Sequence, residues 1–222
     1  AENVAIGKSA LAANTTASYN TAIGAYTLDS NTTGANNIAV GRSSLGVNTT
    51  GDSNTSVGTF ALDANTTASN NTAVGYASLT ENTTGIENTA LGGYTLDENT
   101  TGNYNSALGY LALHKNTTGI KNTGLGRTTL EKVTTGGSNT AVGFDAGYDI
   151  TTGSNNTLVG VGTFAGAATG NNRIVLGWGT QGTGDAHFTF GQSSGSDRVY
   201  NAFQSNASWT RVSDQRYKEE IT

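Results

Sequence analysis

The chain has no proline, no cysteine and no methionine among its 222 residues, and only 12% of its residues are charged. The absence of cysteine excludes disulfide cross-links and is compatible with any redox compartment. The missing initiator methionine indicates a fragment or a processed chain, and no signal peptide is visible. Lys and Arg number 11 against 16 Asp and Glu, so no basic patch is available to bind nucleic-acid phosphates.

Apolar residues are scarce as well. The longest apolar runs are a few residues long, which excludes a membrane-spanning helix. Leu, Ile, Val and Phe make up 40 of the 222 residues, and so small a share is one mark of disorder. Disorder usually also needs a high net charge, whereas the net charge here is −5. Such a chain can fold if the same few residues are used in the same way many times.

A 17-residue period organises the chain up to residue 177. Asn stands four residues before a periodic Gly and Leu four residues after it in most units, and Arg173 takes the Asn position in the last unit. No insertion breaks the phase, and the unit reads roughly N-x-A-Φ-G-x-x-x-L-x-x-N-T-T-G-x-x, where Φ is Ile, Val or Leu. The periodic glycines are Gly7, Gly24, Gly41, Gly58, Gly75, Gly92, Gly109, Gly126, Gly143, Gly160 and Gly177.

A strict period predicts units that contact their neighbours in register. Seventeen residues are too few for two helices, and the Gly and N-T-T-G segments would break them. N-x-A-Φ-G alternates as a short strand does, and N-T-T-G is typical of a turn. We therefore predict an all-β fold, a parallel β-solenoid whose coils each hold two short strands and two turns. Eleven coils at a strand spacing of about 4.8 Å would form a rod about 50 Å long.

Side-chain parity assigns the first strand of each coil to two faces. Thr21, Ile23 and their equivalents point one way, while Ala22 and Gly24 point the other. We expect the Φ residues and the later Leu to form a thin core, with Ala and Gly on the outer face. A solvent-exposed face accepts any polar residue, so its restriction to small residues predicts the close approach of another backbone.

The predicted core is too thin to be stable alone. Two or three apolar side chains per coil do not offset an ordering cost of about 1–2 kcal/mol per residue. Association through the Ala/Gly face would supply the missing burial. A homo-oligomer is therefore expected, and a trimer best suits a fibrous rod.

The strings NVAIG, NTAIG, NIAVG and NTAVG resemble the head repeats of YadA-like trimeric autotransporter adhesins. The resemblance covers residues 1–177 and implies a left-handed parallel β-roll that forms trimers along the faces with small residues. The unit here is longer than the usual one of that family, which leaves the geometry of the extra turn open. Such rolls serve many surface proteins, so the resemblance speaks for the fold more than for a function.

The segment WTRVSDQRYKEEI, residues 209–221, resembles the entry to the intramolecular chaperone domain (peptidase S74 type) of phage tail fibres and tailspikes. In that family the chaperone drives trimerisation and then cleaves itself off at a Ser-Asp bond, with a Lys five residues after the Ser as its base. The resemblance assigns these roles to Ser213, Asp214 and Lys218. The chemistry requires a base because an unactivated hydroxyl is a weak nucleophile. Residues 213–222 would be only the start of that domain.

Residues 178–212 lose the period and are expected to form a neck or stem, with short strands at 187–192 and 198–204. Trp178 and Trp209 are expected to plug the axis of the trimer. His114 and His187 stand apart from other metal-ligand residue types, so we expect neither a metal site nor a cofactor.

The repeated Asn residues predict side-chain ladders. Seven N-T-T strings match N-glycosylation acceptors, but the resemblance implies a phage or bacterial chain, in which they would be turns. Aromatic residues one or two positions after the periodic Gly, such as Tyr76 and Tyr94, are expected to pack at coil edges. Sugar binding by an exposed tyrosine stripe is the alternative.

The leading hypothesis is a structural or host-recognition segment of a trimeric phage tail fibre or tailspike, located in the virion, outside the cell. Its partners would be two further copies of the chain, other virion tail proteins and a receptor or glycan on the host surface. A bacterial trimeric surface adhesin is the alternative, and an ice-binding solenoid is a minor one suggested by the Thr repeats. No enzyme is expected beyond self-cleavage at Ser213, which would need the rest of the chaperone domain.

Overall fold

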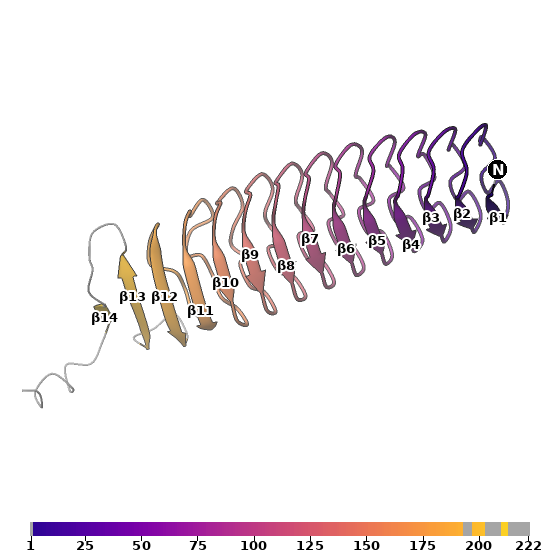
Figure 1. The fold of residues 1–222 in the computed structure, drawn as a ribbon. Helices are drawn as coiled ribbons and strands as arrows, with labels where there is room; N and C mark the ends of the chain where they lie inside the picture. The colour runs from indigo at the N-terminus through magenta and orange to yellow at the C-terminus, as the bar shows by residue number, and fades with distance from the viewer. Residues whose placement is uncertain (1, 193–196, 203–209, 213–222) are drawn as a thin grey trace, which may run out of the picture.

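The computed structural model describes residues 2–192, 197–202 and 210–212. Within these residues the chain is all-β and has no helix. It winds as a parallel β-solenoid with a 17-residue repeat, and its coils stack into a rod (Figure 1). The predicted fold class is confirmed in these respects.

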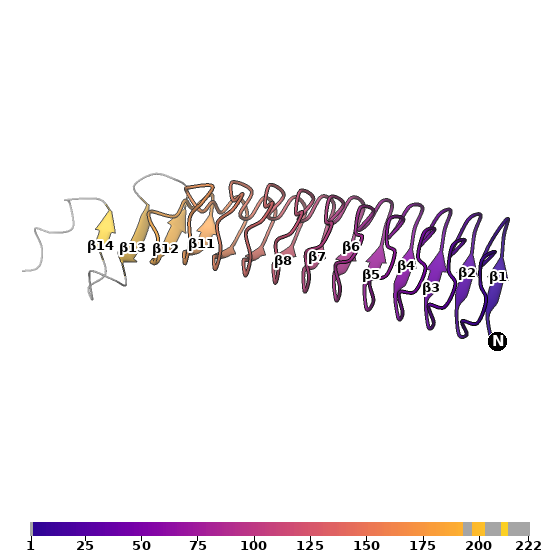
Figure 2. The same ribbon diagram turned by 90° about the horizontal axis from the view of Figure 1, so that it is seen from above.

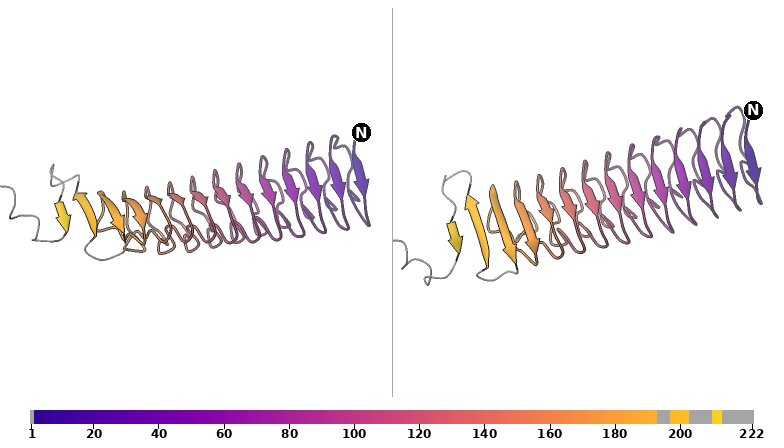
Figure 3. Two further views of the ribbon diagram at one scale, coloured as in Figure 1. Left: turned by 90° about the horizontal axis from the view of Figure 1, so that it is seen from below. Right: turned by 60° about the horizontal axis from the view of Figure 1, so that its bottom comes forward.

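One sheet of fourteen strands runs the length of the rod, with the strands in sequence order. From β1 to β11 each strand pairs in parallel with its equivalent 17 residues on, as Thr72 does with Thr89. Figures 2 and 3 show these strands aligned in one row along the rod. The strands are β1 (Val4–Ile6), β2 (Thr21–Ile23), β3 (Ile38–Val40), β4 (Thr55–Val57), β5 (Thr72–Val74), β6 (Thr89–Leu91), β7 (Ser106–Leu108), β8 (Thr123–Leu125), β9 (Thr140–Val142), β10 (Thr157–Val159), β11 (Ile174–Trp178), β12 (His187–Gln192), β13 (Arg198–Ala202) and β14 (Thr210–Val212).

Each coil from β1 to β10 contains one strand, and the prediction of two strands per coil was wrong. In place of the second strand the chain makes tight turns around residues in the left-handed region, such as Tyr94 at φ 54° and Leu96 at φ 53°. A leucine rarely adopts this conformation, and its cost is about 1–3 kcal/mol. Leu96 is fully buried in the coil, so its packing offsets the strain. The same arrangement recurs from coil to coil.

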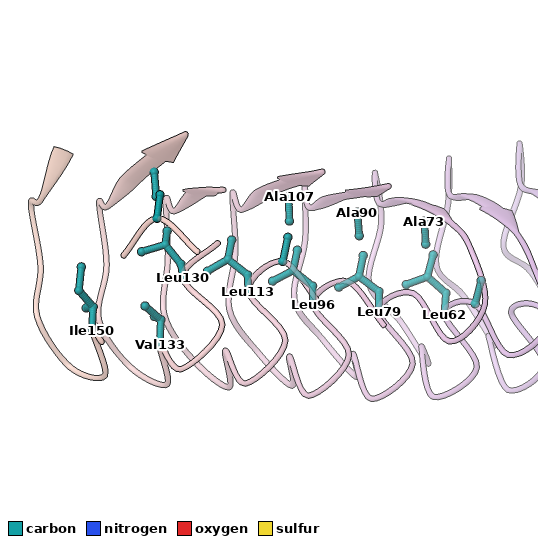
Figure 4. Close-up of a cluster of buried hydrophobic side chains, with 14 of the residues drawn as sticks. Leu62, Ala73, Leu79, Ala90, Leu96, Ala107, Leu113, Leu130, Val133 and Ile150 are labelled. Atoms are coloured by element: carbon teal, nitrogen blue, oxygen red, sulfur yellow. The ribbon is translucent and has the colours of Figure 1, made fainter. Parts of the chain in front are cut away.

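The core lies between the strands and these leucines, and it contains the middle residue of each three-residue strand rather than the Φ residue. This middle residue is Ala in most coils, Ser56 in β4, Gly124 in β8 and Leu158 in β10. Ala73, Ala90 and Ala107 point from their strands toward the opposite wall, where they face Leu62, Leu79 and Leu96 respectively (Figure 4). The middle residue of β6, Ala90, has no exposed surface. The third residue of a strand is more exposed, as Val57 of β4 is at 36%. The predicted parity was right, but the assignment of the two sides was reversed. The coil is too narrow for a Leu and a second large side chain to face each other across it.

The small residues do mark a close backbone approach, but the approaching backbone belongs to the next coil of the same chain. At Gly75, where φ is +139°, an added Cβ would lie 2.4 Å from the carbonyl oxygen of Gly92. No side chain fits at that distance, so glycine is required at this position. The restriction to small residues therefore has an intramolecular cause and does not indicate a partner.

Two ladders of buried asparagine connect the coils, as the sequence predicted. In the first, the Asn88 amide nitrogen Nδ2 donates to the Gly102 carbonyl (2.8 Å), and its Oδ1 accepts from the backbone N–H of Asn105 (2.9 Å). In the second, built from the N-T-T strings, Asn99 Nδ2 donates to Asn82 Oδ1 (2.8 Å). These side chains are fully buried, so the folded chain hides them from a glycosylating enzyme.

The regular stack ends after β11. The spacing to β12 falls to 14 residues, from Ile174 to Phe188, and β13 and β14 then add in antiparallel fashion. Arg173 ends the first asparagine ladder: its backbone N–H donates to Asn156 Oδ1 (3.0 Å), and its guanidinium donates to Asp185 (2.7 Å). β12 coincides with one predicted neck strand, and β13 covers most of the other.

Candidate functional site

An unbroken column of large apolar side chains runs along the outer face of the sheet. It consists of the third residue of each strand from β1 to β10 and its equivalent in β11, and we name it the aliphatic column. The strand register places each of these residues beside the next. Its members are Ile6, Ile23, Val40, Val57, Val74, Leu91, Leu108, Leu125, Val142, Val159 and Leu176.

Seven of the eleven side chains of this column are at least 36% exposed, and the other four are partly buried. Ile6 is 59% exposed and Leu108 is 49% exposed, whereas the preceding Ala107 is 2% exposed. Ten steps of about 4.8 Å make the column about 48 Å long. Soluble monomers rarely expose a continuous apolar surface of this kind, which usually marks an interaction site.

A column of hydroxyl side chains lies beside the aliphatic column on the same face. Among β1 to β11 seven strands begin with Thr, including Thr72 and Thr89, and β7 begins with Ser106. Val4, Ile38 and Ile174 replace the hydroxyl in three strands. The outer face is therefore half aliphatic and half hydroxyl-bearing, with the two kinds of side chain separated into parallel columns.

At the C-terminal end the aliphatic column widens into a shallow apolar hollow. Leu176 pairs in register with Phe190 of β12, and Phe190 pairs with Val199 of β13. With Phe188 these side chains line most of a hollow of about 850 Å³. The hollow continues the same face, so the apolar surface extends beyond the regular coils into the neck.

The predicted cleavage residues Ser213, Asp214 and Lys218 lie outside the described residues, as does Trp209. Their assignment stays a prediction. Trp178 ends β11 and is 63% exposed, but its expected place on a trimer axis depends on partner chains and also stays a prediction.

The two histidines lie in unrelated places. His114 has its ring nitrogens 3.8 Å from an Asp97 oxygen and 3.6 Å from a Glu98 oxygen. His187 hydrogen-bonds to Thr183 (2.7 Å) and stacks on Tyr200. In the part of the chain that the structure describes, no group of three or more His, Cys, Asp and Glu side chains is placed to hold a metal ion.

Sequence reasoning missed the aliphatic column as a surface because it placed the Φ residues inside. The signal that could have found it was the Leu four residues after each Gly, since one Leu and one Ala already fill the coil.

The described residues contain no helix long and apolar enough to cross a membrane. Comparison with known proteins gives no match to a family model, a curated protein or a solved structure.

Proposed function

We propose that this chain is a structural segment of a trimeric fibre, of the phage tail fibre or tailspike kind, in which three rods associate through their aliphatic columns. The observation that carries the proposal is the continuous exposed column from Ile6 to Leu176. Burial of one half-exposed aliphatic side chain contributes about 1 kcal/mol. Seven exposed positions and four partly buried ones in each chain would give association a substantial driving force, even after the entropic costs of binding are subtracted.

Closed symmetry about an axis parallel to the rod suits this column. Each coil would then meet the same coil of the other copies, and the columns would stay in contact along their whole length. A face-to-face dimer would bury the hydroxyl column as fully as the aliphatic one, and buried hydroxyls need partners. Three rods that meet along the aliphatic columns alone leave the Thr hydroxyls nearer to water. This separation of the two columns favours a trimer.

The test is the mass of the chain in solution, measured by light scattering. The wild-type chain should have three times the monomer mass of 22.6 kDa. Val57→Asp combined with Leu108→Asp should give monomers, because both carboxylates would be placed in the contact. The matched control is Val47→Asp combined with Ile120→Asp, which introduces the same charges at positions 43% and 41% exposed but outside the strands.

A wild-type mass near that of the monomer would refute the proposal, and a dimer would refute its geometry. Equal masses for the two double variants would show that the aliphatic column is not the interface. Circular dichroism of both variants would establish that the β-fold is retained, so that a lower mass reports dissociation and not unfolding.

A bacterial surface adhesin built on the same trimeric rod is the alternative, and the cleavage chemistry distinguishes the two. If the gene encodes a chaperone domain after Thr222 and the longer chain is expressed, a fibre protein should be cut between Ser213 and Asp214. Ser213→Ala and Lys218→Ala should each leave one uncut chain. Intact-mass spectrometry decides this point, and a cut that survives Ser213→Ala would refute the chaperone assignment.

The hydroxyl column favours one further use of the same face, as an ice-binding surface. Regular Thr hydroxyls beside aliphatic groups on one face of the sheet are the feature in its support. The two uses exclude each other where the face is buried in a trimer. A monomeric mass together with thermal hysteresis in the freezing of its solution would favour ice binding over the fibre.

A further inference from the structure

A second column of large side chains follows the C-terminal ends of the strands, one or two residues after the periodic Gly. The members that are aromatic form the aromatic column. Edge-to-face contacts link four of them in consecutive coils: Phe60 to Tyr76 (6.2 Å between ring centroids), Tyr76 to Tyr94 (5.2 Å) and Tyr94 to Tyr110 (6.1 Å). The aromatic column comprises Tyr26, Phe60, Tyr76, Tyr94, Tyr110 and Phe144.

Cationic side chains fill three coils that lack an aromatic residue in this column. Lys8 lies 5.1 Å from the ring centroid of Tyr26, and Arg42 lies 5.2 Å from that of Phe60. Arg127 lies over both Tyr110 (5.9 Å) and Phe144 (5.4 Å). The nine coils from Gly7 to Gly143 therefore each contribute one ring or one cation, and ring–ring and cation–π contacts join many of the neighbours.

These rings are not needed to fill the core. Tyr76 is 50% exposed, Tyr110 46% and Phe144 42%, and the leucines and alanines already occupy the inside of the coils. The large group stands one residue after Gly in some coils and two in others, and the residue at the first position is small where the ring stands at the second, as in Gly93 before Tyr94. One large group per coil is maintained despite this variation.

Half-buried carboxylates lie beside the column. Burial raises the pKa of Asp97, and the nearby His114 partly offsets this rise. Burial likewise raises the pKa of Asp63, partly offset by Arg42. Asp97 is close enough to Tyr94 to contribute to the raised pKa of that phenol, after the larger effect of desolvation. The surface thus combines aromatic rings, phenol hydroxyls and carboxylate acceptors, which can accept hydrogen bonds from hydroxyl groups.

We propose that the aromatic column binds a linear, neutral polysaccharide that lies along the rod. Aromatic rings offer apolar surface to the C–H faces of pyranose sugars, and the phenol and carboxylate oxygens can pair with sugar hydroxyls. From Tyr26 to Phe144 the rings extend over seven coil steps, about 34 Å at 4.8 Å per step. A surface that repeats along one direction matches a ligand that repeats along one direction.

The charges beside the column favour a neutral glycan over an acidic one. Asp97 lies near Tyr94 and Asp63 lies near Arg42, and the cations Arg42 and Arg127 are already engaged with rings. A second copy of the chain is the other possible occupant. It is disfavoured because three cationic side chains, Lys8, Arg42 and Arg127, lie over rings of the aromatic column, whereas the aliphatic column is apolar in every coil.

The experiment uses an array of linear neutral glucans, galactans and mannans of increasing length, with uronic-acid oligosaccharides as acidic counterparts. The wild-type chain should bind neutral members, and binding should strengthen with their length. Tyr76→Ala combined with Tyr110→Ala should weaken binding about tenfold or more, a change of about 1.4 kcal/mol or more. The matched control is Tyr19→Ala combined with Tyr104→Ala, which removes two tyrosines 60% and 46% exposed outside the column.

The outcomes separate this proposal from the fibre proposal on which it rests, because the mass of each variant is measured in the same preparation. No binding to any neutral glycan, equal binding by the two double variants, or stronger binding to the uronic acids would overturn it. A lower mass for the Tyr76/Tyr110 variant with unchanged glycan binding would assign the column to a chain–chain contact instead. A trimer without glycan binding would leave the fibre proposal standing and remove this one.

Discussion

Replacement of Asn88 by Asp tests whether the first asparagine ladder, to which Asn88 belongs, holds the coils together. The substitution preserves the shape of the side chain and removes only its N–H donor. Asn88 is fully buried, and its Nδ2 donates to the Gly102 carbonyl at 2.8 Å. At neutral pH the side chain would be an ionised carboxylate. One of its oxygens would face the Gly102 carbonyl oxygen, which accepted a hydrogen bond from Asn88.

The cost follows from this geometry. A buried charge without a partner costs about 3–5 kcal/mol, and the loss of a hydrogen bond adds to the penalty. A carboxyl in this position should have a folded-state pKa raised above its ordinary value near 3.9. The folded variant therefore binds more protons than the unfolded one, and its stability should rise as the pH falls through the raised pKa. Once protonated, the carboxyl can donate to Gly102, and a deficit of about 1 kcal/mol should remain.

Urea unfolding followed by circular dichroism at pH 7 and at pH 4 provides the measurement. The matched control is Asn70→Asp, because Asn70 is exposed and has a φ of 63° that Asp tolerates. It should change stability by no more than about 0.5 kcal/mol. Two results would refute the role of the ladder in stability. The first is a loss of unfolding free energy at pH 7 that is no larger for Asn88→Asp than for the control. The second is a loss for Asn88→Asp that does not become smaller at pH 4.

Two further predictions concern the core and the end of the stack. Ala90→Leu should destabilise the coil by about 1–3 kcal/mol through overpacking, since Ala90 is the fully buried middle residue of β6; an unfolding midpoint equal to that of wild type would show that the core can expand. Asp185→Asn should loosen the last regular coil at neutral pH, because the backbone N–H of Asn171 and the buried Arg173 lower the pKa of Asp185. The stability that Asp185 contributes is present above its ordinary pKa of 3.8 and is lost as the pH falls through the lowered pKa. Hydrogen exchange near Arg173 should therefore differ between wild type and variant at pH 7 and become equal in acid. A difference that persists in acid would contradict this cause.

The sequence by itself determined the period, the parallel register and the role of Asn. A repeat of 17 residues without insertions brings equivalent residues together in every coil, and Asn at a fixed position can pair with its equivalent above and below. The leucines of the core were also predictable, because a large apolar residue at a constant position must be buried repeatedly. The neck strands were found from their own composition.

Only the tertiary structure decided which side of each strand faces the inside. Parity separates Ala90 from Leu91 but does not say which of them is buried, and hydrophobicity alone favours Leu91. Where the wall opposite the strand holds a leucine, as Leu79 at a φ of 53° faces Ala90, the space that remains is filled by Ala, Ser or Gly. The left-handed turns that set this width involve ordinary residues such as Tyr94 and Leu96, which carry no local signal for that conformation. The width of the coil, and with it the exposed aliphatic column, is a property of the closed turn.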